Sequence, residues 1–143
     1  MDADFANDTE MHPLFPSGEW EGFYTYHTNS MGEKSEMAFF LNFSKGKLEG
    51  GGSDNIGGFS WKGTYNLEAL TCKMTKSYAA HDVFYEGNVD ENGIWGVCHI
   101  PPYMNGGFHI WPKKTEQEAA AAEEYSAEKV LEKSKSLSPT NQN

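Results

Sequence analysis

The chain has 143 residues, of which 38% are hydrophobic and 14% aromatic, as is typical of a single domain with an aromatic core. Its formal net charge is −10, and all 11 of its basic residues are lysines. Nucleic-acid binding needs a basic surface and usually arginine, and anionic lipids repel an acidic chain. The composition therefore argues against nucleic acid and membrane surfaces as partners.

Residues 1–17 form an acidic N-terminal arm that contains no uninterrupted apolar stretch. A signal peptide or a membrane-spanning segment needs such a stretch, so we expect neither of them here. The default location for such a chain is the cytoplasm.

Alternation of apolar and polar residues predicts the first three strands, at 19–27, 36–44 and 47–53. The second is the clearest, with apolar side chains at every other position. Lys45-Gly46 fits a tight hairpin turn between the second and third strands. The glycine-rich run 50–58 is the most flexible-looking part of the domain, because glycine permits unusual backbone angles and close approach of another group.

Five more strands are predicted in the second half of the domain, at 59–65, 70–76, 83–89, 94–100 and 107–111. The run Asp90-Glu91-Asn92-Gly93 is a strong turn signal between two of them. Pro101-Pro102 ends the seventh strand, and Pro112 ends the eighth. Most connections are therefore short enough to be hairpins.

A short pattern recurs inside these strands: an apolar or aromatic residue, any residue, then glycine. Glycine weakens a flat strand, so its repeated use on the inward face predicts sharply bent strands whose large neighbours need room. A small closed barrel is built in this way. The copies are Trp20-Glu21-Gly22, Leu48-Glu49-Gly50, Trp61-Lys62-Gly63, Tyr85-Glu86-Gly87 and Ile94-Trp95-Gly96.

Eight antiparallel strands joined by successive hairpins predict an all-β, up-and-down barrel over residues 18–113, because closure removes the exposed sheet edges. A β-sandwich is the alternative. Cys72 and Cys98 fall on inward positions and are expected to be reduced. The predicted inward set is Trp20, Tyr24, Tyr26, Met37, Phe39, Leu41, Phe43, Leu48, Phe59, Trp61, Tyr65, Cys72, Met74, Val83, Tyr85, Val89, Ile94, Cys98, Ile100, Phe108 and Ile110.

The composition changes after Pro112. Alanine, glutamate and lysine dominate 114–135, and Thr115 with Glu118 fits a capping box, so this segment is predicted to be a helix. The helix either packs lightly on the barrel or extends to a partner. Residues 136–143 are expected to form a disordered tail.

The triplet Gly18-Glu19-Trp20 resembles the Gly-x-Trp signature that opens the first strand in lipocalins and avidins, the calycin group of up-and-down barrels. The count of eight strands over 18–113 agrees with this resemblance. What the resemblance implies is a ligand pocket inside the barrel. In lipocalins this tryptophan packs beneath a basic residue, for which Lys113 and Lys114 are the nearby substitutes here.

Signals for catalysis or metal binding are weak. The sequence lacks a nucleophile elbow, a zinc-protease helix and a phosphate loop, so an enzyme is less expected than a binding protein. The nucleophile, base and orienting group of a hydrolase could meet at one rim if the fold brings together Ser53, Asp54, His81 and Asp82. The simpler interpretation is that these polar groups cap turns. His99 and His109 share outward parity and can be cross-strand neighbours, but two histidines are too few to hold a metal.

Two functional hypotheses remain, with an unrecognised hydrolase third and no cofactor expected. The first is a protein-interaction or assembly subunit, because large apolar groups outside a barrel need a cover. Its predicted interface residues are Phe40, Phe84, Trp95 and Trp111. The second is a carrier for a small apolar ligand of the calycin type, since buried tyrosine hydroxyls need each other, water or a ligand. Its predicted ligand-binding residues are Tyr24, Tyr26, Trp61, Tyr65, Tyr85 and His81.

Overall fold

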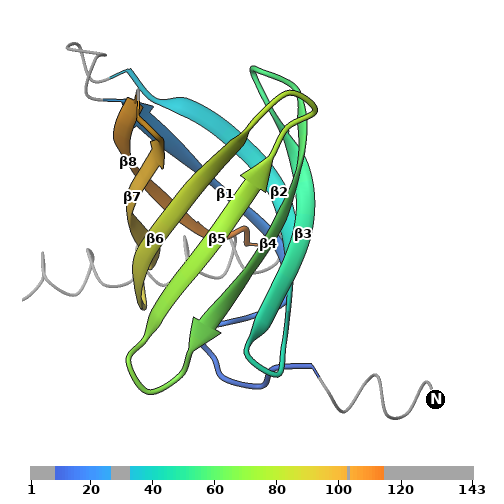
Figure 1. Ribbon diagram of the computed structural model, residues 1–143. Coiled ribbons are helices and arrows are strands. Elements are labelled where there is room, and N and C mark those ends of the chain that lie inside the picture. The colour runs from blue at the N-terminus through green and yellow to red at the C-terminus, as the bar shows by residue number, and fades with distance from the viewer. Residues whose placement is uncertain (1–8, 27–32, 103, 115–143) are drawn as a thin grey trace, which may run out of the picture. The chain divides into compact units, whose positions relative to one another are not determined.

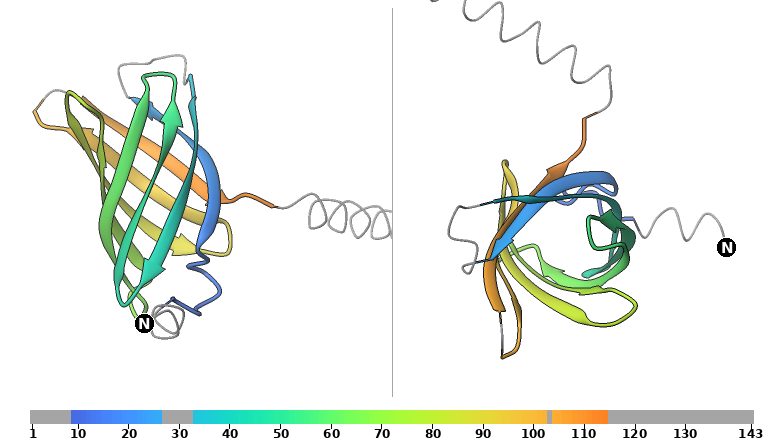
Figure 2. Two further views of the ribbon diagram at one scale, coloured as in Figure 1. Left: turned by 90° about the vertical axis from the view of Figure 1, so that its right-hand side faces the viewer. Right: turned by 90° about the horizontal axis from the view of Figure 1, so that it is seen from above.

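A computed structural model describes residues 9–26, 33–102 and 104–114, which form one closed β-barrel (Figures 1 and 2). The strands follow the order of the chain around the barrel, and β1 pairs with β8 to close it. The strands are β1 (Gly18–Tyr26), β2 (Ser35–Ser44), β3 (Lys47–Asp54), β4 (Gly58–Asn66), β5 (Thr71–Ser77), β6 (Asp82–Asp90), β7 (Gly93–Ile100) and β8 (Met104–Pro112).

All eight predicted strands are present, every neighbouring pair is antiparallel, and closure excludes the β-sandwich alternative. The predicted helix in 114–135 and the tail 136–143 lie outside the described residues, apart from Lys114. Within the described ranges, no helix has both the length and the apolar character needed to cross a membrane.

The hairpin turns follow from local sequence. Lys45 and Gly46 both have positive φ, at 50° and 81°, as the tight turn between β2 and β3 requires. Leu70, predicted to begin a strand, instead has a φ of 54° and ends a four-residue turn before β5. The carboxamide of Asn66 accepts hydrogen bonds from the backbone N–H groups of Glu68 and Ala69, so this turn caps itself.

The repeated inward glycines allow close approach between neighbouring strands. A Cβ at Gly50 would lie 1.9 Å from the carbonyl oxygen of Phe40, and one at Gly63 would lie 2.1 Å from that of Lys73. Neither position accommodates a side chain without moving the neighbouring backbone. The apolar-x-glycine pattern therefore marks the places where the wall of the barrel is tightest.

The core lies inside the barrel, and the predicted register is correct. Every residue of the predicted inward set is buried except Tyr26 and Ile100, which are half-buried and pack against the core. The two cysteines are free and buried, and burial raises the pKa of the Cys72 thiol to about 12 and that of Cys98 to about 11. The interior is mainly aromatic, with ring pairs such as Trp61 and Tyr85 at 4.9 Å.

The described part of the N-terminal arm, residues 9–17, closes one end of the barrel, which we call the closed end (Figure 1). Phe15 is fully buried there and stacks on the ring of Tyr65 at 4.8 Å. The hydroxyl of Tyr65 donates a hydrogen bond of 2.7 Å to the Glu10 carboxylate, and the indole of Trp20 donates one of 2.9 Å to the carbonyl of Pro16. The arm therefore acts as a plug of the barrel, which the sequence pattern did not predict.

Candidate functional site

The opposite end of the barrel, which we call the polar end, holds a buried ion pair. Lys76 has inward parity on β5, and Asp54 ends β3. Their side chains are completely buried, and the Lys76 Nζ lies 2.6 Å from the Asp54 Oδ2. Moving two charges out of water is unfavourable unless further groups stabilise them, so such a pair needs a surrounding structure to hold it.

Aromatic rings surround the Lys76 ammonium. Its Nζ lies 4.3 Å from the ring centre of Tyr24, 4.5 Å from that of Phe59 and 5.0 Å from that of Tyr78. Tyr85 and Trp61 are slightly more distant, at 5.7 and 5.9 Å. The negative ring faces attract the cation and replace part of its lost hydration.

The Asp54 carboxylate is held from two sides. Its Oδ2 also accepts a hydrogen bond from the hydroxyl of Tyr78. Its Oδ1 accepts backbone hydrogen bonds of 2.9 Å from Ile56 and 3.3 Å from Gly57, within the turn that joins β3 to β4. Because one carboxylate both caps this turn and binds Lys76, the turn geometry and the ion pair depend on each other.

The pKa shifts have clear causes. Burial raises the pKa of Asp54, but hydrogen bonds from Lys76 and Tyr78 outweigh burial, so the net pKa is lowered. Burial lowers the pKa of Lys76, and its hydrogen bond to Asp54 opposes that shift. Burial is also the largest cause of the raised pKa values of Tyr78 and Tyr85, which keeps both hydroxyls protonated.

The indole N–H of Trp61, unlike the polar groups of Lys76, Asp54 and Tyr78, has no hydrogen-bond partner among the described residues. Trp61 is 1% exposed, and among buried side-chain nitrogen and oxygen atoms of the described residues its Nε1 is the one without a hydrogen-bond partner. The indoles of Trp20, Trp95 and Trp111 all donate hydrogen bonds. A buried polar group left unpaired costs about 1–3 kcal/mol, so this N–H calls for an acceptor.

The predicted ligand-binding residues separate into two groups. Tyr24, Trp61 and Tyr85 all lie beside Lys76, and the ring of Tyr26 lies 5.6 Å from that of Tyr24. His81 is exposed at the polar end, with its ring 4.9 Å from that of Tyr78. Tyr65 is at the closed end, where its hydroxyl is bound to Glu10, and it takes no part in this cluster.

Lys76 and Tyr78 belong to this site although neither was among its predicted residues. A signal for Lys76 was available, because it continues the inward alternation of Cys72 and Met74 on β5. A lysine in that register is unusual enough to indicate a buried charge. Tyr78 follows the end of β5, where strand alternation no longer predicts which way a side chain points.

The weaker candidates are not brought together as a reactive site. Asp54 binds Lys76 inside the barrel, whereas Ser53 and His81 are exposed. The register pairs His99 with Asn105 and His109 with Trp95, so these two histidines are not direct cross-strand partners. Among the described residues, no group of three or more potential ligands can hold a metal ion.

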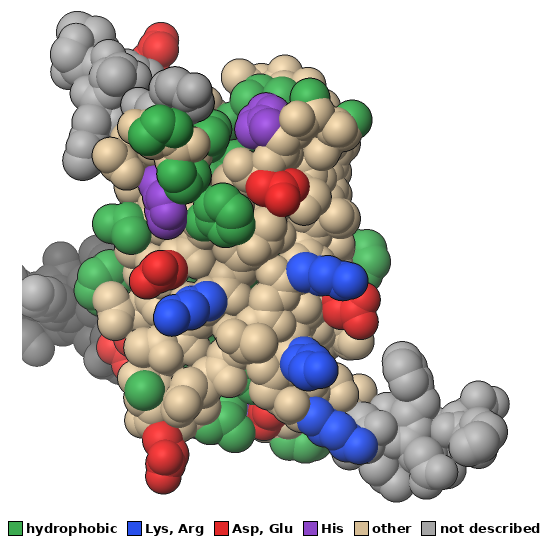
Figure 3. All heavy atoms as spheres, in the orientation of Figure 1, with side chains coloured by type: hydrophobic (Ala, Val, Ile, Leu, Met, Phe, Trp, Pro, Cys, Tyr) green, Lys and Arg blue, Asp and Glu red, His purple; other side chains and the backbone are tan. Residues whose placement is uncertain are grey.

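On the outside of β6, β7, β8 and β1, apolar side chains form a surface that we call the outer aromatic face. Trp95 is 43% exposed and Val97 58%, and the register places Trp95 beside His109. Figure 3 shows apolar side chains gathered over the upper part of β6 and β7, beside a histidine. The face consists of Phe23, Phe84, Trp95, Val97, His109 and Trp111.

A hollow of about 570 Å³ lies at the β1 side of this face and is lined in part by Phe23, Trp111, Glu21 and Glu36. The Trp111 indole donates a hydrogen bond of 3.2 Å to Glu21. The ammonium of Lys34 lies 4.4 Å from the ring centre of Phe23. The hollow therefore combines aromatic surface with two carboxylates and one cation.

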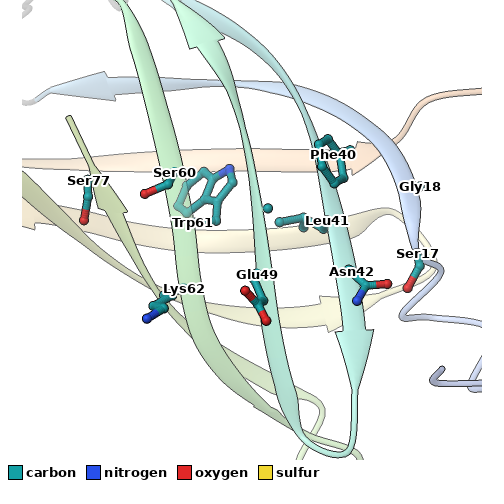
Figure 4. Close-up of a pocket in the computed structure, with 11 residues that line it drawn as sticks. Ser17, Gly18, Phe40, Leu41, Asn42, Glu49, Ser60, Trp61, Lys62 and Ser77 are labelled. Atoms are coloured by element: carbon teal, nitrogen blue, oxygen red, sulfur yellow. The ribbon is translucent and has the colours of Figure 1, made fainter. Parts of the chain in front are cut away.

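Phe40, the remaining predicted interface residue, is 55% exposed on β2 and belongs to a different surface. It borders an outer groove of about 980 Å³ over β2, β3 and β4 (Figure 4). Glu49 and Lys62 are direct cross-strand partners on β3 and β4, and both line this groove. The four predicted interface residues thus do not form one continuous patch.

No family model, no curated protein and no solved structure matches the chain. Trp20 of the calycin-like triplet packs against Phe43, with ring centres 5.8 Å apart. At a coarse level the chain shares the eight-stranded, antiparallel, closed architecture of calycin barrels.

Proposed function

We propose that this protein is a non-enzymatic binding barrel whose outer aromatic face docks a protein partner. The observation that carries the proposal is the exposure of Phe84, Trp95 and Val97, at 39%, 43% and 58%, on adjacent strands. Large apolar groups gathered on one face are typical of an interaction surface, whereas single exposed apolar residues are ordinary.

The chemistry of the face favours a partner with apolar and basic side chains. Asp90 and Glu21 accept hydrogen bonds from the indoles of Trp95 and Trp111, so carboxylates lie beside the aromatic rings. Glu36 adds a second carboxylate to the hollow beside Phe23. A lysine or arginine of the partner entering this hollow gains both charge attraction and contact with aromatic rings.

Site-specific crosslinking tests this proposal. A photoreactive amino acid at position 97 of the full chain is expected to capture one defined protein in the cells that make it. With that protein purified, the double variant Trp95→Ser/Val97→Ser should bind at least tenfold more weakly, since loss of central aromatic contacts dominates binding energy.

Ile56 provides the matched control because it is 55% exposed, close to the value for Val97, but lies in the turn after β3. Ile56→Ser should leave the affinity unchanged. Equal weakening by Ile56→Ser, or no specific product at position 97, would contradict docking at the outer aromatic face. Light scattering of the full chain shows whether the captured partner is a second copy.

A second candidate function is a small-ligand carrier of the calycin type. The observation that favours it is the contrast between the two ends of the barrel: Phe15 plugs one, whereas the ion pair and tyrosines occupy the other. An interior charge among aromatic rings resembles the few polar groups that orient a ligand in an otherwise apolar pocket. This function predicts saturable binding of an apolar fluorescent probe to the full chain, with Trp61 or Tyr85 responding.

A further inference from the structure

The structure points to a class of ligand for the polar end, and this inference rests on the second candidate function. We infer that the interior beside Lys76 and Trp61 binds a small, uncharged aromatic molecule through a carbonyl oxygen.

Donors at this site outnumber strong acceptors. The Lys76 ammonium has three N–H groups but one short contact, to Asp54; its contacts to the Tyr85 hydroxyl and the Met37 sulfur are long, at 3.4 and 3.5 Å. The Trp61 indole N–H has no partner among the described residues. A ligand that fits these groups must supply a hydrogen-bond acceptor.

The unpaired N–H lies in the same layer of the barrel as the ion pair. Trp61 and Lys76 are direct cross-strand partners on β4 and β5, and both side chains face inward. The Lys76 Nζ lies 5.9 Å from the Trp61 ring centre, and the Tyr85 ring lies 4.9 Å from that of Trp61. The indole of Trp61, the Lys76 ammonium and the Tyr85 ring thus belong to one cluster, in which an acceptor bound to the indole would lie.

The charges at this site favour an uncharged acceptor. Lys76 and Asp54 already neutralise each other, so a ligand carboxylate would bring an additional charge into a buried place. An ammonium ligand is excluded for a different reason, because the aromatic cage already holds the Lys76 ammonium. Phe39 and Phe59 flank Trp61, with ring centres 5.3 and 5.6 Å away, and offer contact to an aromatic ligand.

Four naphthalene probes test this inference on the full chain: 2-acetylnaphthalene, naphthalene, 2-naphthoate and 2-(aminomethyl)naphthalene. The indole N–H signals of the four tryptophans are followed by two-dimensional NMR, and Trp61→Phe assigns the relevant signal. We expect 2-acetylnaphthalene to bind at least tenfold more tightly than the other three probes and to shift the Trp61 signal most, since it alone supplies a neutral acceptor.

Two variants sharpen the test. Trp61→Phe removes the donor but keeps an aromatic ring, so it should reduce the affinity for 2-acetylnaphthalene to that for naphthalene. Trp95→Phe is the control because Trp95 is 43% exposed on the outer surface, and it should change nothing.

The outcomes separate the ligand class from the carrier function. If naphthalene and 2-acetylnaphthalene bind equally tightly and shift the Trp61 signal equally, the barrel is a carrier but the carbonyl preference is wrong. If no probe shifts the Trp61 signal, the carrier function itself fails and a buried water is the simplest partner for the indole. Shifts confined to Trp95 or Trp111 would place the probes on the outer surface and overturn the inference.

Discussion

At the scale of single residues, the buried pair of Lys76 and Asp54 distinguishes this barrel from one filled only by apolar side chains. Replacing one member leaves the other charge buried without a partner, which is strongly destabilising. Replacing both members leaves no buried charge, so the cost in stability is small. The interaction between the two side chains is therefore measured by a double-mutant cycle and not by either single substitution.

Asp54→Asn should lower the free energy of unfolding by about 3–5 kcal/mol, because it leaves the Lys76 ammonium without its counter-ion. The double variant Asp54→Asn/Lys76→Met should recover most of this loss, since methionine is apolar and similar in length and the introduced carboxamide can still cap the turn. Urea unfolding of the natural chain, the single variants Asp54→Asn and Lys76→Met, and the double variant measures both changes. Losses that simply add would show that the two side chains do not interact.

The lowered pKa of Asp54 makes part of the stability depend on pH. Since the pKa of Asp54 in the folded chain lies below the ordinary value of 3.8, the unfolded chain binds more protons than the folded chain as the pH falls below that value. The stability from this group is fully present above the ordinary pKa and is lost as the pH falls through the folded one. Urea midpoints between about pH 5 and about pH 2 should therefore decline less steeply for Asp54→Asn/Lys76→Met than for the natural chain. Identical slopes would assign the decline to other carboxylates.

At the scale of elements, the arm at residues 9–17 acts as the plug of the closed end. Phe15 is fully buried against Phe43 and Tyr65, whereas Met11 on the same arm is 87% exposed. The arm is also tied to the barrel through the backbone, where the Glu10 N–H donates a hydrogen bond of 2.9 Å to the carbonyl of Phe43.

Phe15→Ala should lower the free energy of unfolding by about 3–5 kcal/mol, because it removes a large ring from a packed site. Met11→Ala is the control and should change stability by less than about 0.5 kcal/mol, as exposed substitutions generally do. Thermal unfolding of both variants provides the comparison. A change below about 1 kcal/mol for Phe15→Ala would mean that the arm covers the barrel without stabilising it.

At the scale of the whole molecule, closure through β1 and β8 removes the exposed edges of the sheet. Amide protons that bond across this seam should exchange with solvent as slowly as those between β4 and β5. Native-state hydrogen exchange followed by NMR measures both sets. Faster exchange by about tenfold or more along β1 and β8 would indicate that the seam opens before the rest of the barrel.

The sequence by itself determined the strands and their inward faces, and it favoured a closed barrel over a β-sandwich; the pairing of β1 with β8 decided between the two. Strand alternation has a period of two, so it assigns each side chain to one face from local sequence alone. The glycines in Leu48-Glu49-Gly50 and Trp61-Lys62-Gly63 indicated where strands approach closely, and the Cβ distances at both sites agree. Short hairpins then left little freedom in the order of the strands.

Only the tertiary structure decided which side chains meet inside the barrel. Asp54 and Lys76 are separated by 22 residues, and their contact depends on the stagger of β3, β4 and β5 around a closed wall. Phe15 reaches the closed end because a segment without regular strand structure folds under the barrel, which no periodicity predicts. Local alternation specifies the face of a side chain, whereas its height and its neighbours follow from long-range pairing of the strands.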